Sequence, residues 1–222
     1  MIKLLVFGHQ NPDTDAITSA IAYAYYLNHN GTEAEAVALG LPSEETIYAL
    51  NQFKIDAPRV IETAANETDT VALVDHNEAQ QSVSDIKDVE VYAEVDHHRI
   101  ANFETANPLY YRAEPVGCTN TILYKMFQEK NIAIPADIAG LMLSAIISDT
   151  LLFKSPTCTP EDEAAAAALT EFAGVPLQEY GLPMLKAGTN FGDKSIAELL
   201  TLDANSFQLG AKNVRFTTVN PV

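Results

Sequence analysis

Short apolar runs alternate with helix-like segments along the chain, and this alternation constrains the fold more than any other feature of the sequence. The runs at residues 2–7 and 71–74 and the mixed run at 91–95 resemble short buried strands, and residues 35–39 are a fourth candidate. Apolar spacing and start signals predict helices at residues 16–27, 43–51, 119–130, 135–147 and 159–174. Strands alternating with helices predict an α/β fold: a doubly wound, mostly parallel sheet flanked by helices.

Two of these helices carry clear boundary signals. Ser43 is a good cap for the helix over residues 43–51. Thr159 supplies another cap and is followed by a proline at the first helical position and by acids in the first turn. That last helix is expected to stop at Gly174, because glycine readily adopts the backbone conformation that ends a helix.

The composition fits a soluble, cytoplasmic protein with a real core. Hydrophobic residues make up 47% of the chain and charged residues 19%, and no apolar run approaches the length that spans a membrane. The N-terminal apolar run is too short for a signal peptide, and two cysteines are too few for a disulfide framework. A net charge of −17 argues against a nucleic-acid surface. It would also repel phosphates, unless several carboxylates hold divalent cations.

The composition changes after about Lys186. Residues 187–193 have a linker-like sequence, which is followed by a short predicted helix and a hairpin-like alternation from Phe207 through Gly210 to Phe216. We expect a metal-binding catalytic domain over residues 1–187. Residues 188–222 would then form a linker and the incomplete opening of a second, substrate-closing domain, with too little material to bury a core of its own.

Acidic and imidazole side chains follow directly on the first predicted strand. Residues 8–15 contain His9, Asp13 and Asp15 just before a helix, at the strand end where open α/β sheets bind their ligands. One carboxylate here could simply cap the helix. Two carboxylates and a histidine are more than a cap requires, so this segment is a candidate metal site.

Three further elements end in the same kind of residue. The run at 71–74 leads into Asp75-His76, the run at 91–95 leads into Asp96-His97-His98, and the helix at 135–147 leads into Asp149. Singly, each could be a surface turn or a helix-ending acid. Their recurrence at four element ends favours one site at the edge where parallel strands end.

The ligand types narrow the choice of metal. Carboxylates and imidazoles without thiolates suit manganese, iron or zinc better than calcium. Cys118 is expected to be a packed, inert thiol and not a ligand. A carboxylate shared between ions would allow a two-metal site, with ions ~3.5–4 Å apart, that activates a water for in-line attack on phosphorus.

These motifs closely resemble those of the family II inorganic pyrophosphatases, members of the phosphoesterase superfamily named for its Asp-His-His motif. The resemblance covers nearly the whole chain to about residue 190. It rests on residues 8–15, 74–77, 96–99 and 148–150, and extends through residues 113–119 and 152–157.

The resemblance implies a residue role at each motif. One metal would be held by His9, Asp13 and Asp75, and the other by Asp15, Asp75, His97 and Asp149, with Asp75 bridging. His98 would contact the substrate phosphate and act as an acid, which makes Asp75, His98 and Asp13 the candidate catalytic residues. The metals would be two Mn²⁺ ions, with Co²⁺ as an alternative, and Mg²⁺ would accompany pyrophosphate. The protein would be a homodimer joined through this first domain.

The sequence departs from the family pattern in two ways. Family members continue well beyond residue 222 with an Arg-Lys pair that grips the substrate, and they usually carry a lysine where this chain has Asn205. Each lost clamp can cost ~10²–10³ in rate, so weak activity is one expectation. Lys154 and Arg99 are candidate phosphate contacts by their position beside the motifs.

Three functions therefore compete at this point. The first is hydrolysis of inorganic pyrophosphate to two phosphates by a two-metal-activated water. The second is a related phosphoesterase acting on polyphosphate or short oligonucleotides, which the acidic charge disfavours for nucleic acid. The third is an isolated metal-binding, dimer-forming core without significant activity.

Overall fold

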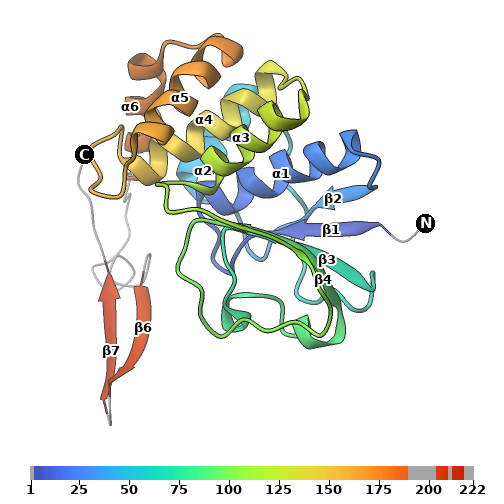
Figure 1. Cartoon of the computed structure of the whole chain (residues 1–222). Helices are drawn as coiled ribbons and strands as arrows, with labels where there is room; N and C mark the ends of the chain where they lie inside the picture. The colour runs from blue at the N-terminus through green and yellow to red at the C-terminus, as the bar shows by residue number, and fades with distance from the viewer. Residues whose placement is uncertain (1–2, 190–203, 210–211, 218–222) are drawn as a thin grey trace.

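Five parallel strands form the sheet around which the chain is built (Figure 1). The computed structural model describes residues 3–189, 204–209 and 212–217. The sheet order is β2-β1-β3-β4-β5, and each neighbouring pair is parallel. The strands are β1 (Leu4–Phe7), β2 (Ala34–Ala36), β3 (Thr70–Val74), β4 (Glu90–Asp96) and β5 (Tyr110–Ala113). The predicted α/β class and parallel sheet are confirmed.

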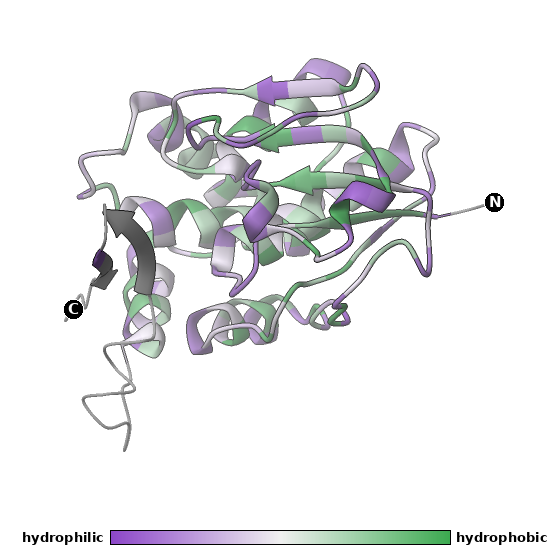
Figure 2. Cartoon of the chain, turned by 90° about the horizontal axis from the view of Figure 1, so that it is seen from below, coloured by the Kyte–Doolittle hydropathy of each residue, from purple (hydrophilic) through white to green (hydrophobic). Residues whose placement is uncertain are grey.

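The α-helices gather over one face of the sheet, as Figure 1 shows. They are α1 (Thr14–His29), α2 (Glu44–Phe53), α3 (Thr119–Lys130), α4 (Ala136–Thr150), α5 (Pro160–Ala173) and α6 (Leu177–Gly188). The larger core lies between these helices and the sheet. Connecting segments cover the other face and include two 3₁₀ turns, η1 (Ala79–Gln81) and η2 (Ile86–Asp88). Figure 2 shows apolar (green) stretches along strands of the sheet on this face. Within the described residues, no helix is long and apolar enough to cross a membrane.

The predicted helix boundaries are close to those observed. Ser43 caps α2, and Thr159 caps α5 with a reciprocal bond from Asp162, while Gly174 ends α5 in the left-handed conformation. The helix expected over residues 135–147 continues to Thr150, so Asp149 lies on the last turn of α4 instead of after it. The strand expected at residues 35–39 is observed as β2, which begins one residue earlier and ends three residues earlier than predicted.

One strand and one α-helix have no counterpart in the sequence prediction. β5 is a half-exposed edge strand, so it lacks the apolar run that marks a buried strand. α6 contains Pro183 and Gly181, which normally argue against a helix. Close packing explains Gly181, because a Cβ added there would lie 2.9 Å from the Leu152 side chain.

The region after α5 bears on the domain expectation. Ala187 and Gly188, the first two residues of the linker-like stretch, belong to α6. The predicted hairpin is confirmed as the antiparallel pair β6 (Ala204–Leu209) and β7 (Lys212–Thr217). The short helix expected before it falls outside the described residues.

The strand order creates a reversal that positions the site. From β1 the chain moves to one edge of the sheet to form β2, and it then returns to the other side of β1 to form β3, β4 and β5. The loops after β1 and β3 therefore leave neighbouring strand ends in opposite directions. Such a reversal is where open α/β sheets bind ligands outside the carboxyl ends of their strands.

Candidate metal centre

The loop after β1 brings His9, Asp13 and Asp15 to the carboxyl end of the sheet. Asp13 caps α1 by accepting a hydrogen bond from the Ala16 amide at 2.9 Å, so the simple capping role is real. The other Asp13 oxygen nevertheless lies 3.6 Å from His9 Nε2, so it remains available to bind a cation together with that nitrogen. Gly8 permits this tight turn, because an added Cβ would lie 2.6 Å from the Ala16 Cβ.

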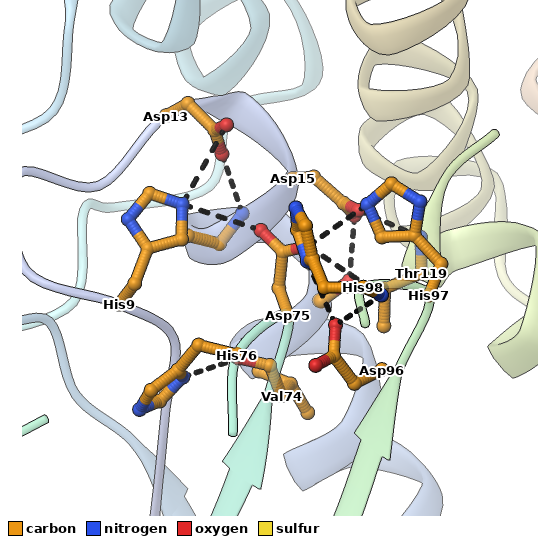
Figure 3. Close-up of polar contacts among 12 residues, drawn as sticks. His9, Asp13, Asp15, Val74, Asp75, His76, Asp96, His97, His98 and Thr119 are labelled. Carbon is orange, nitrogen blue, oxygen red and sulfur yellow. Dashed lines mark hydrogen bonds and ion pairs between the residues drawn. The ribbon is translucent and has the colours of Figure 1, made fainter. Parts of the chain in front are cut away.

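Asp75 lies at the centre of the cluster (Figure 3). It directly follows β3, is 1% exposed and has a positive φ of 59°, a strained conformation for an aspartate. Its Oδ2 lies 3.5 Å from His9 Nε2, and its Oδ1 lies 3.4 Å from His97 Nε2. Its two oxygens therefore face histidines from two different strand ends.

Two groups of potential ligand atoms flank Asp75. A third group links them, so that the groups are His9, Asp13 and Asp75; Asp15, His97 and Asp149; and Asp75, His97 and His98. Within each group the atoms lie within 4.8 Å of one another. Each group combines side chains from separate segments of the chain. The six sequence-predicted ligand candidates are thus brought together at one sheet edge.

The two histidines are held by their other ring nitrogens. His97 Nδ1 lies 3.0 Å from the Val116 carbonyl, and His9 Nδ1 lies 2.9 Å from the Gln10 carbonyl. A carbonyl can only accept, so each Nδ1 carries a proton. Each Nε2 faces Asp75 and is the nitrogen that can bind a cation. Histidine ligands of metals in proteins are commonly oriented in this way.

The remaining candidates lie at the rim. His98 has a side chain that is 51% exposed, and its Nδ1 lies 2.8 Å from Asp96 and 3.6 Å from Asp75. Arg99 is more exposed, and its guanidinium donates to Glu78 at 3.1 Å. Lys154 is exposed on the turn that follows α4.

Burial and mutual repulsion perturb the acids of the cluster. Burial alone would raise the pKa of Asp75, but the neighbouring His9 and His97 rings, 3.5 and 3.4 Å from its oxygens, outweigh burial and lower that pKa. Burial and then the charge of Asp75 raise the pKa of Asp15 to about 6. Burial and the charge of Asp15 also raise the pKa of Asp149. Carboxylates this close resist joint ionisation, and divalent cations relieve that repulsion.

Buried oxygens without partners test whether a cation fits. Asp75 Oδ2 and Asp149 Oδ2 are buried and accept no hydrogen bond within the described part of the chain. A buried carboxylate oxygen needs a donor or a cation, since leaving it alone is costly. Together with the carboxylate and imidazole donors, these atoms fit a manganese-type pair of ions.

Sequence reasoning missed a layer of polar residues at the start of α3. The Thr119 amide donates to Asp15 Oδ2 at 2.7 Å, and its hydroxyl donates to Asp75 Oδ1 at 3.1 Å. Asn120 donates to Asp15 Oδ1 at 2.8 Å. The available signal was the run of three polar residues, 119–121, that opens the helix. Cys118, next to them, is buried, and burial raises the pKa of its thiol, in keeping with a packed side chain.

Comparison with known proteins agrees with this geometry. Residues 3–146 match the model of the DHH family, N-terminal domain. The chain is 63% identical over its full length to the manganese-dependent inorganic pyrophosphatase of Bacillus subtilis, covering 72% of that protein. It is 67% identical to an Enterococcus faecalis protein named "Probable manganese-dependent inorganic pyrophosphatase", also covering 72% of it.

A solved structure gives the same picture. The crystal structure of the Methanococcus jannaschii "putative family II inorganic pyrophosphatase" superposes with a TM-score of 0.84 at 38% identity. The match covers 95% of this chain and 69% of that one. The chain therefore belongs to the DHH family and, within it, to the manganese-dependent inorganic pyrophosphatases.

Proposed function

We propose that this protein hydrolyses inorganic pyrophosphate to two phosphates at the cluster around Asp75. The observation that carries the proposal is the position of the Asp75 carboxylate. Its two oxygens face His9 and His97, which belong to two separate groups of potential ligands. A carboxylate placed in this way is suited to bridging two ions, and the names of the related proteins specify both manganese and pyrophosphate.

The proposed ligand sets follow from these groups. One ion would be held by His9, Asp13 and Asp75, and the second by Asp15, Asp75, His97 and Asp149. When bound, the Mn²⁺ pair, or Co²⁺ in its place, supplies Lewis-acid activation of water and neutralises phosphate charge. Mg²⁺ would accompany the pyrophosphate.

The rim residues would act on the substrate. Asp96 holds one nitrogen of the half-exposed His98 ring, so the other is available to donate a proton or a hydrogen bond to a phosphate oxygen. Arg99 and Lys154 are exposed cations next to the motifs and would add positive charge where phosphate is held. Their positive charge would offset part of the local negative charge of the acidic cluster.

The organisation of the molecule is part of the proposal. Residues 1–187 would form the catalytic domain, and residues 188–222 a linker and the opening of a substrate-closing domain. The protein would work in the cytoplasm as a homodimer. β5, an edge strand of the described sheet with Tyr110 47% exposed, supports a contact between copies.

Phosphate release from pyrophosphate tests the proposal. With Mn²⁺ the chain should release phosphate, and a chelator should stop the release. Asp75→Asn should abolish both activity and bound manganese, because an amide cannot replace the bridging charge. Asp56→Asn, at an exposed aspartate, is the control and should retain both. Activity in the Asp75 variant, or faster release from polyphosphate than from pyrophosphate, would contradict the proposal.

A further inference from the structure

Asn77 connects the segment after β3 to the segment after β4 through three hydrogen bonds. Its side-chain amide donates to Asp96 Oδ2 at 2.7 Å and to the Arg99 carbonyl at 3.0 Å. Its carbonyl oxygen accepts from the Ala101 amide at 2.9 Å. The residue is 2% exposed, so these bonds are shielded from water.

The orientation of the Asn77 amide is fixed by its partners. Both groups opposite Nδ2, a carboxylate oxygen and a carbonyl oxygen, can only accept. The group opposite Oδ1 is an amide N–H, which can only donate. A flipped amide would lose all three bonds, so Asn77 presents a donor to Asp96.

Asp96 in turn holds His98. The Asp96 side chain is fully buried, and its Oδ1 accepts both the His98 backbone amide at 2.9 Å and His98 Nδ1 at 2.8 Å. Figure 3 shows the Asp96 carboxylate beneath the His98 ring. One Asp96 oxygen is therefore used by His98 and the other by Asn77. This arrangement leaves His98 Nε2 as the ring nitrogen free to face a substrate.

We propose that Asn77 is a positioning residue: it fixes the Asp96 carboxylate, which aims the His98 ring at the substrate phosphate. The inference rests on the proposed function of His98 as a phosphate contact. None of the three partners of Asn77 belongs to the proposed ligand sets. Loss of Asn77 should thus affect turnover more than metal binding.

Two variants and a matched control separate this role from general stability. Asn77→Ala removes all three bonds, and Asn77→Asp places an oxygen where the donor was. We expect kcat for pyrophosphate to fall about 10–100-fold in Asn77→Ala, the cost typical of a misplaced catalytic group, with bound manganese unchanged. Asn28→Ala is the control, since Asn28 also bridges two segments with three hydrogen bonds, to Ala24 and Ala34 at the far end of α1. It should leave kcat unchanged.

A double substitution tests whether Asn77 acts through His98. In a His98→Gln background, Asn77→Ala should change kcat by less than about twofold, because coupled residues are not additive. An equal loss in both backgrounds would mean that Asn77 has only a structural role, which would overturn the proposal.

An NMR measurement on the metal-free protein provides a readout that does not depend on activity. The Nδ1 proton of His98, assigned by its absence in His98→Gln, should give a slowly exchanging resonance in the parent protein and in Asn28→Ala. It should exchange rapidly in Asn77→Ala, and an unchanged resonance there would overturn the proposal. If the parent protein releases no phosphate, the proposed function fails, while this measurement still decides whether Asn77 orders His98.

Discussion

Thr119 joins the two halves of the candidate metal centre, because its amide binds Asp15 and its hydroxyl binds Asp75. Thr119→Val keeps the shape and the amide bond but removes the hydroxyl. We expect manganese affinity to fall about tenfold or more, as second-layer hydrogen bonds to ligands commonly contribute 10–100-fold. Competition with a chelator of known affinity would measure the change.

Thr170→Val is the matched control for that substitution. Among the described residues, its hydroxyl bonds only the Ala166 carbonyl of its own helix, α5. Its manganese affinity should equal that of the parent protein. Equal affinity in Thr119→Val would mean that the hydroxyl does not orient Asp75.

At the residue scale, the sequence indicated the acids and histidines but not what holds them. His9, Asp75 and His97 stood out because each follows a strand-like run. Thr119 and Asn120 did not, because their roles depend on contacts with residues 44 and 105 positions away in the chain. Asn77 lay inside a recognised motif, yet its bonds to Asp96 and Arg99 require the folded loops. The metal and substrate roles remain predictions.

At the element scale, Asp162 ties the start of α5 to the start of α3. Its buried carboxylate accepts from the Gly117 amide at 2.9 Å, from the Thr121 hydroxyl at 2.6 Å, and from the amide and hydroxyl of Thr159. Asp162→Ala would leave these donors without a partner and remove the reciprocal cap. We expect the free energy of unfolding to fall by about 2–4 kcal/mol. Urea unfolding would measure it as a lower midpoint at an unchanged slope.

Glu163→Ala is the control for Asp162, since Glu163 is the exposed acid at the next position of the same helix. It should change the free energy of unfolding by no more than about 0.5 kcal/mol. Similar midpoints for the two variants would show that the Asp162 network contributes little to stability.

Helices with cap signals and strands with buried runs were predictable because local chemistry determines their ends. The cap at Thr159 and the stop at Gly174 are examples. β5 and α6 were not predictable, since tertiary contacts outweigh local preference there. β5 gains its hydrogen bonds from β4, and α6 tolerates Pro183 because it packs on α2 and α4.

At the scale of the whole molecule, the sheet order follows from the strand pattern only in part. The alternation of strands and helices predicted a parallel sheet, but not the reversal between β2 and β3 that brings the strand ends together. The net charge of −17 pointed to bound cations, and the buried acids of the metal centre support that reading. One buried acid outside the proposed ligand sets links charge to the stability of the whole chain.

Glu94 is that acid: it lies on β4, is 0% exposed, and neither carboxylate oxygen has a hydrogen-bond partner in the described residues. Burial, and then the charge of Asp96, raise its pKa to about 9. The folded protein therefore keeps this proton between about pH 4.5 and pH 9, where the unfolded chain has lost it. Since the folded state binds more protons at Glu94 in that range, the contribution of Glu94 to stability falls as pH rises through it.

Glu94→Gln removes the titration while keeping the shape of the side chain. Its stability relative to the parent protein should increase with pH between about 5 and 9, by at most about 1.4 kcal/mol per pH unit. Urea unfolding at several pH values would measure this difference. Glu90→Gln, at an exposed position of the same strand, should keep a constant difference from the parent protein. A constant difference for Glu94→Gln as well would mean that Glu94 ionises in the folded protein as it does in the unfolded chain.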